Sequence, residues 1–109
     1  MSDPRSFSLE CSIQRGAFSD ERIVSIPNPG GEAYVGIASR QYCWKENDTP
    51  LGETEPNEGE TIEGKVAARV IKANGSGKVL VSIPDGEVIA VRPEQLKRRP
   101  QGVSPSVPV

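Results

Sequence analysis

The amino-acid sequence predicts an all-β domain, a single small barrel of five to six antiparallel strands with a one-turn helix near the C-terminus. Glycine and proline number 11 and 10 among the 109 residues, which suits short strands joined by turns. Several short segments alternate apolar and polar residues, and no segment carries a helical apolar stripe of useful length. We predict one domain over residues 1–97 and a proline-rich disordered tail over residues 98–109.

The first half of the chain contains three extended segments. Residues 7–14 (FSLECSIQ) alternate without a fault, which predicts a strand that buries Phe7, Leu9, Cys11 and Ile13. Residues 21–26 (ERIVSI) predict a second strand. Residues 33–44 are long for one strand, so we expect a bend near Gly36 or Ser39.

The second half predicts a three-stranded meander over residues 64–73, 78–83 and 87–92. A two-residue loop at Gly75-Ser76 pairs Ala73 with Lys78 and Val70 with Val81, and a three-residue loop at Pro84–Gly86 pairs Val81 with Ile89. Both turn choices place the same apolar residues on one face, which supports the meander. These residues are Val66, Ala68, Val70, Val79, Val81, Ile83, Ile89 and Val91.

Residues 93–96 predict one helical turn, with Pro93 at its first position and Leu96 closing an end of the core. The stretch 63–96 combines a Gly64-x-Val66 opening, two tight turns and a last strand that runs into this turn. It resembles SH3-like barrels, including Tudor-like and KOW-type members. The KOW-type resemblance implies association with ribosomes or transcription. The peptide-binding motif of signalling SH3 domains is absent.

The residue types present argue against catalysis. The chain has no histidine, which removes Ser-His and Cys-His nucleophile pairs and histidine-ligated metals. Its two cysteines, Cys11 and Cys43, are too few for a structural zinc site and lack the spacing of a redox pair. We therefore expect two buried free thiols, no enzyme activity, no cofactor and no resident metal. No signal peptide or membrane span is visible, so we expect a cytoplasmic protein without a membrane partner.

The net charge of −2 hides a strong asymmetry. Residues 46–63 hold seven acidic side chains and no basic one, whereas residues 64–109 hold eight basic and three acidic ones. We predict a flexible acidic loop over residues 46–63, with Leu51 as the only apolar residue of its central part. Removal of residues 48–60 is then expected to leave the fold intact.

The acidic loop allows three interpretations. Its carboxylates, Asp48, Glu53, Glu55, Glu58 and Glu60 among them, could dock a basic partner. They could bind Ca²⁺, although the spacing of an EF-hand loop is absent. They could also serve only to keep the protein soluble.

Three aromatic residues, Tyr34, Tyr42 and Trp44, share one parity along the third extended segment. If they face outward beside the acidic loop, they would suit a proline-rich or arginine-containing peptide. The alternative is that the barrel closes over them or that the strand breaks and the parity is lost.

A basic set forms the basis of a second functional hypothesis. Its members are Arg69, Lys78, Arg92, Lys97, Arg98 and Arg99. Together they could follow a phosphate backbone, or they could be scattered surface charge. The leading hypothesis is a non-enzymatic protein–protein interaction module that engages a basic or proline-rich partner through the acidic loop and the aromatic face. The alternative is a nucleic-acid-associated barrel, and a third possibility is an enzyme or small-molecule binder.

Overall fold

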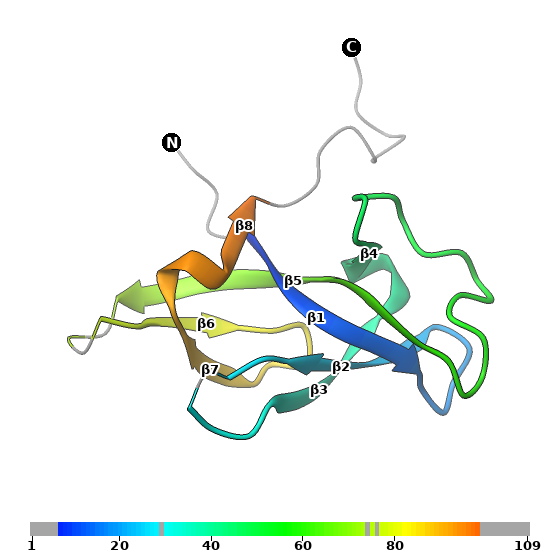
Figure 1. The fold of residues 1–109 in the computed structure, drawn as a ribbon, viewed down its shortest axis with the longest axis horizontal. Helices are drawn as coiled ribbons and strands as arrows, with labels where there is room; N and C mark the ends of the chain where they lie inside the picture. Colours follow the sequence, from blue (N-terminus) through cyan, green and yellow to red (C-terminus); the bar gives the residue numbers. More distant parts are fainter. Residues whose placement is uncertain (1–6, 29, 74, 76, 99–109) are drawn as a thin grey trace, which may run out of the picture.

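The computed structural model describes residues 7–28, 30–73, 75 and 77–98. Eight strands form one antiparallel sheet that curls into a nearly closed barrel (Figure 1). The strands are β1 (Phe7–Arg15), β2 (Glu21–Ile26), β3 (Tyr34–Ser39), β4 (Cys43–Lys45), β5 (Thr61–Ala73), β6 (Val79–Ser82), β7 (Val88–Val91) and β8 (Leu96–Arg98). Two 3₁₀ turns, η1 (Arg40–Tyr42) and η2 (Pro93–Gln95), are the only helical elements in the described ranges. The predicted all-β class and barrel-like sheet are confirmed, and no described helix is long and apolar enough to cross a bilayer.

The two longest strands, β1 and β5, lie side by side and organise the sheet. The path through it runs β3-β2-β1-β5-β6-β7. On the edge that faces away from β5, β1 pairs with β2 near its end and with β8 near its start (Figure 1). On the edge that faces away from β1, β5 pairs first with β4 and then with β6. Each central strand therefore serves two partners along one edge, which lets a short chain enclose a core.

The core follows the predicted alternation. Leu9, Cys11 and Ile13 of β1 are buried, while Phe7 at its start is only half-buried. From the predicted meander face, six residues are buried and two pack partly buried against them. The six are Val66, Ala68, Val81, Ile83, Ile89 and Val91, and the two are Val70 and Val79. Leu96 packs against the same core, as predicted.

The meander register is right at its centre and wrong at the first turn. Val70 pairs with Val81, and Val81 pairs with Ile89, as the turn chemistry predicts. Ala73, however, pairs with Val79 and not with Lys78, because the register shifts by one residue between Val70 and Lys72. A bulge of this kind leaves one residue outside the ladder, and the side chain of Ile71 at this point is 49% exposed.

The third extended segment bends at Ser39, one of the two predicted positions. There β3 gives way to η1, and the chain resumes as β4 on a different part of the sheet. Strand β3 stays at the edge of the sheet beside β2. Because a 3₁₀ turn separates β3 from β4, residues before and after it no longer share a common parity.

The open side of the barrel, between β3 and the β6–β7 turn, is closed by a side chain. The amide of Ile37 in β3 donates to a carboxylate oxygen of Asp85 at 3.1 Å. A Cβ added to Gly36 would lie 2.7 Å from Ile83 Cδ1, so a glycine lets this edge approach the core. At the neighbouring end, the Gln95 amide donates to the Pro27 carbonyl at 2.9 Å.

Both cysteines are free and buried, as predicted. Cys11 lies opposite Gly64 and Cys43 lies opposite Val66, on the two opposite edges of β5. Two strand spacings amount to about 9–10 Å, whereas a disulfide requires Cα atoms within about 7 Å. Burial raises the pKa of Cys43 to about 12. Burial also raises the pKa of Cys11, and the charge of the neighbouring Cys43 raises it further. The thiols act as small apolar groups.

Gly64 allows close packing of β4 and β5, so Gly64→Ala is expected to lower the free energy of unfolding. A Cβ at this position would lie 2.6 Å from Ile13 Cδ1 and closer still to the Trp44 carbonyl oxygen. We expect a loss of about 1–3 kcal/mol in urea titrations. Gly75→Ala is the control, since a Cβ there meets nothing within 4 Å. Equal stability of the two variants would show that β4 can shift away at no cost.

The buried thiols are expected to weaken the fold at alkaline pH. Their folded pKa is raised above the unfolded value of 9.0, so their contribution is complete below that value and is lost as the pH rises further. Above about pH 9, each thiol should remove up to about 1.4 kcal/mol of stability per pH unit. Urea titrations at several alkaline pH values measure this slope. The double variant Cys11→Ala/Cys43→Ala should show a shallower slope, and an unchanged slope would show that the thiols do not cause the effect.

Candidate functional site

A fully buried arginine connects the acidic segment, residues 46–60, to the barrel. Arg22 lies in β2 on the same side as Val24 and Ile26, and its exposed fraction is 0%. Its guanidinium donates to the carbonyl oxygens of Glu55 at 2.9 Å and Glu53 at 3.0 Å, and more distantly to that of Gly52 at 3.5 Å. Residues 52, 53 and 55 of the acidic segment are therefore hydrogen-bonded to the barrel through their backbone carbonyl oxygens, and these contacts do not occupy a carboxylate.

The same guanidinium also holds the turn between β1 and β2. It donates to the carbonyl oxygens of Ser19 at 2.8 Å and Glu21 at 2.9 Å. In the described part of the chain Arg22 forms no ion pair, and the acceptors of its guanidinium are backbone carbonyl oxygens. Burial lowers the pKa of Arg22, and nearby Arg15 and Arg40 add to this effect. An arginine nevertheless remains protonated in proteins.

Further contacts fix the rest of the acidic segment. Arg40 donates to the Leu51 carbonyl at 3.1 Å, and Leu51 is itself only 2% exposed. Lys45 pairs with the Glu55 carboxylate at 2.7 Å, and the Gly52 amide donates to the same carboxylate at 2.8 Å. These two contacts, the lysine first, hold the pKa of Glu55 below its usual range. Glu55 thus serves the fold and is not a free surface charge.

Several predictions for this segment need correction. The segment contributes to the core, because Leu51, the apolar residue of its central part, and Pro56 are buried. The predicted loop over residues 46–63 is too long, because residues 61–63 are already part of β5. Removal of residues 48–60 would take away three acceptors of the buried Arg22, so we now expect this deletion to destabilise the fold.

The remaining carboxylates project from this fixed backbone. Glu46, Glu53, Glu58 and Glu60 are exposed, whereas Asp48 pairs with Lys65 of β5. An open hollow of about 460 Å³ lies beside Glu46 and Glu60. Lys45, Glu46, Asn47, Glu55, Glu60, Ile62 and Glu63 line it. The hollow is acidic at its rim and contains one half-buried apolar side chain, Ile62.

The three aromatic residues do not form the predicted outward face. Trp44 is only 7% exposed, and Tyr34 is half-buried against the core. Tyr42, in η1, is 41% exposed. The common orientation was inferred from parity along one strand, and η1 interrupts that strand. Tyr42 lies instead at a second hollow, with Arg69 and Pro84.

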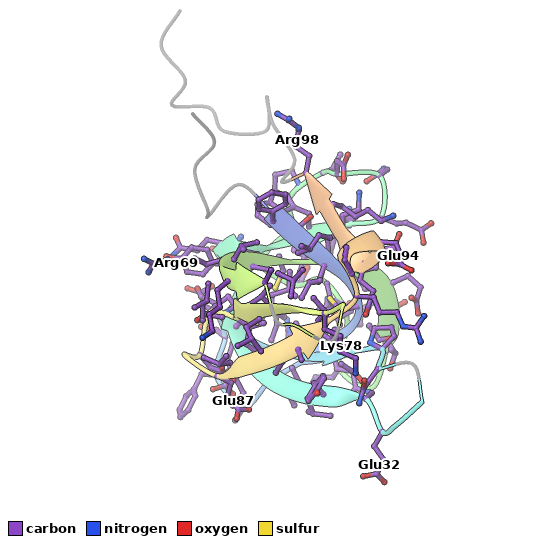
Figure 2. The ribbon with its side chains drawn as sticks, turned by 90° about the vertical axis from the view of Figure 1, so that its left-hand side faces the viewer. Glu32, Arg69, Lys78, Glu87, Glu94 and Arg98 are labelled. Carbon is purple, nitrogen blue, oxygen red and sulfur yellow. The ribbon has the colours of Figure 1, made fainter. Side chains whose placement is uncertain are left out.

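The basic residues lie on separate parts of the surface. Figure 2 shows Arg69, Lys78 and Arg98 pointing outward at well-separated places. Arg92 and Lys97 are exposed near η2 and in β8. Arg98, the first residue of the predicted tail, is the last residue of β8, and residues 99–109, Arg99 included, lie outside the described residues. The described members therefore do not form one continuous basic track.

Metal binding gains no support from the described residues. No three cysteine, aspartate or glutamate side chains among them converge as a metal ion requires.

Sequence reasoning missed Arg22, although a signal was present. Arg22 has the same parity as Val24 and Ile26, and all three are buried. A charged residue in a strand is usually assigned to the solvent side. For this reason the shared parity of Arg22, Val24 and Ile26 was not taken as a sign that Arg22 is buried.

Comparison with known proteins yields no relative. No protein-family model matches the chain, and no curated protein and no solved structure matches it. The SH3-like resemblance of residues 63–96 therefore stays a prediction, and the functional argument depends on the geometry alone.

Arg22→Gln is expected to destabilise the protein strongly. The shorter neutral side chain cannot reach the acceptors on both sides, so buried carbonyl groups lose their donors. We expect a loss of about 3 kcal/mol in urea titrations. Lys72→Gln also replaces a cation by a neutral glutamine, but at an exposed position, and should cost less than about 0.5 kcal/mol. Similar stabilities for the two variants would contradict the structural role of Arg22.

Proposed function

We propose that the protein is a non-enzymatic interaction module that binds a basic stretch of a partner protein on its acidic segment. The observation that carries this proposal is the fixed backbone of residues 51–55, hydrogen-bonded to Arg22 and Arg40. A backbone that is already held by hydrogen bonds loses little further conformational freedom when its side chains bind a partner, which favours affinity.

The hollow beside this segment supports the same partner chemistry. Lysine and arginine side chains combine an apolar stem with a cationic end. Ile62 offers an apolar contact at the hollow, and Glu46, Glu60 and Glu63 offer carboxylates around it. Lys45 is held by Glu55 at its edge, so a partner's cation would meet the other acids.

The nucleic-acid alternative has less support from the geometry. Its described cations are dispersed (Figure 2), and the net charge of the chain is −2. Phosphate binding depends on several cations along one track, and the acidic segment would repel a phosphate backbone. The aromatic part of the leading hypothesis narrows to Tyr42, since Trp44 is buried and Tyr34 packs against the core.

The proposal can be tested with substitutions that replace charged glutamates by neutral glutamines and leave the contacts of Arg22 in place. The triple variant Glu46→Gln/Glu53→Gln/Glu58→Gln removes three exposed carboxylates whose side chains make no hydrogen bond or ion pair in the described structure. The probe is a fluorescein-labelled peptide of alternating arginine and serine, followed by fluorescence anisotropy. We expect its Kd to rise about tenfold, because three charge contacts are lost.

A matched control separates local recognition from total charge. The triple variant Glu32→Gln/Glu87→Gln/Glu94→Gln removes the same charge from exposed positions outside the segment (Figure 2). It should leave the Kd within about twofold, and binding to the unchanged protein should weaken as salt rises. Equal losses in both triple variants would contradict a site on the acidic segment and indicate only a general charge effect.

A further inference from the structure

The register of β5, β6 and β7 fixes which residues lie on the outer face of the meander. Three residues that pair across these strands pack toward the core, namely Val70, Val81 and Ile89. Because successive residues of a strand point to opposite faces of the sheet, the positions next to these three point outward. The outward positions of this surface, which we call the meander face, are Arg69, Leu80, Ser82, Val88 and Ala90.

The bulge in β5 adds one residue to this face. Ala73 pairs with Val79, which packs against the core, so Ala73 belongs to the inward set like Val70. Inward residues of a regular strand are two positions apart, whereas these are three apart, which leaves Ile71 and Lys72 between them. Lys72 pairs with an outward residue of β6, and Ile71 is 49% exposed. The bulge thus presents both an apolar side chain and a cation on the meander face.

The centre of the meander face is apolar. Val88 is 55% exposed, and Leu80 and Ala90 are half-buried. A hollow of about 390 Å³ adjoins them, because two residues of the outward set line it together with the exposed Tyr42. Three of the six large apolar side chains that are exposed among the described residues therefore lie on or beside this face: Tyr42, Ile71 and Val88. Such a concentration of exposed apolar groups is typical of a binding surface.

The charge of the meander face is positive and uncompensated. Arg69 and Lys72 are exposed on its β5 side, and neither forms an ion pair within the described ranges. After Glu63, the strand residues of β5, β6 and β7 include no acid. The acids of the β6–β7 turn, Asp85 and Glu87, lie at one end of the face, and Asp85 is hydrogen-bonded to β3. The face therefore favours a partner that brings carboxylates of its own.

We propose that the meander face binds an amphipathic helix of a partner protein, with a row of apolar side chains flanked by carboxylates. Strand β6 pairs with β5 on one edge and with β7 on the other, so a partner on this face meets side chains and not strand edges. A sheet commonly buries an apolar face against a helix. Three strands about 4.8 Å apart span about 10 Å, which is about the diameter of a helix with its side chains.

The arrangement of the side chains sets the chemistry of this helix. Its apolar row would pack on Ile71, Leu80 and Val88 at the centre of the face. Carboxylates along one flank would pair with Arg69 and Lys72, which both belong to β5. Charged contacts at the rim of an interface fix the orientation of a partner more than they add affinity. The apolar row therefore supplies most of the binding, and the flanking acids select the partner.

Other occupants fit the meander face less well. The helical elements of the described chain are two 3₁₀ turns, and its exposed acids cluster on a segment with few apolar residues, so a second copy does not supply the helix. A nucleic acid would place phosphates against Ile71, Leu80 and Val88, which offer them no cation. An anionic membrane would gain only about 1 kcal/mol from each of the two cations.

This site is separate from the acidic segment, so its failure would leave the proposed function untouched. The probe is the peptide EELAKLLEELAKLLEE with an N-terminal fluorescein and a C-terminal amide, followed by fluorescence anisotropy. As a helix it carries its leucines in one row with glutamates beside them. We expect saturable binding with a Kd below about 100 µM. A peptide of the same composition with its leucines spread around the helix should bind at least about tenfold more weakly.

One matched pair of variants tests the charge of the face. Arg69→Gln/Lys72→Gln should raise the Kd of the probe at least about fivefold, because two charge contacts are lost. Lys97→Gln/Arg98→Gln removes the same charge from exposed positions of β8, away from Arg69 (Figure 2). It should leave the Kd within about twofold.

A second pair of variants tests the apolar centre. Val88→Asp places a carboxylate under the apolar row and should raise the Kd at least about tenfold. Val35→Asp makes the same change on β3, where the valine side chain is 62% exposed. It should leave the Kd within about twofold. Urea titrations of both variants confirm that the barrel is folded.

Each of the remaining outcomes counts against the proposal. No saturable binding of the probe up to about 1 mM, or equal losses within either matched pair, would show that the meander face does not take such a helix. Concentration-dependent dimers that Val88→Asp abolishes would assign the face to a second copy. Binding of phosphatidylserine vesicles or of oligothymidine that Arg69→Gln/Lys72→Gln abolishes would assign it to a membrane or to a nucleic acid.

Discussion

The buried guanidinium of Arg22 is the interaction on which the rest of the arrangement depends. A cation without a carboxylate partner is costly to bury, and here carbonyl oxygens from two separate loops surround it. Neither loop supplies enough acceptors alone, so the β1–β2 turn and the acidic segment must both be in place before the charge is satisfied. Arg22 therefore couples two parts of the chain about 30 residues apart in sequence, as the 33-residue separation of Arg22 and Glu55 shows.

That coupling decides what kind of surface the acidic segment presents. A segment with many acids and few apolar residues repels itself and stays extended unless something holds it. Here the guanidinium groups of Arg22 and Arg40 bind its carbonyl oxygens, and among the described residues Lys45 and Lys65 are the cations that pair with its carboxylates. The segment is fixed through its main chain while most of its negative charge faces solvent. A barrel that attracted the carboxylates themselves would have neutralised the surface in the act of ordering it.

Much of the barrel could be predicted from the sequence, because parity and turn chemistry act over a few residues. The strand at residues 21–26 and the pairs Val70–Val81 and Val81–Ile89 agree with the structure. The bulge near Ile71, the pairing of β8 with β1 and the role of Arg22 could not be predicted in this way, since each depends on contacts between distant segments. The aromatic prediction was wrong for the same reason: η1 breaks the strand, and nothing local to Tyr34 or Trp44 announces it.

The carboxylate of Asp85 has a consequence for the behaviour of the protein in crowded solution. Strand β3 is an edge of the sheet, and its outer side exposes Val35 and Ile37 at 62% and 47%. An exposed apolar edge is a template on which another chain can add, and repeated addition leads to aggregation. Asp85 already accepts the hydrogen of the Ile37 amide and places a negative charge beside it. A chain that approached this edge would find the Ile37 amide already bonded and would have to displace the Asp85 carboxylate from it. The contact between β3 and the β6–β7 turn therefore also opposes fibre-like growth.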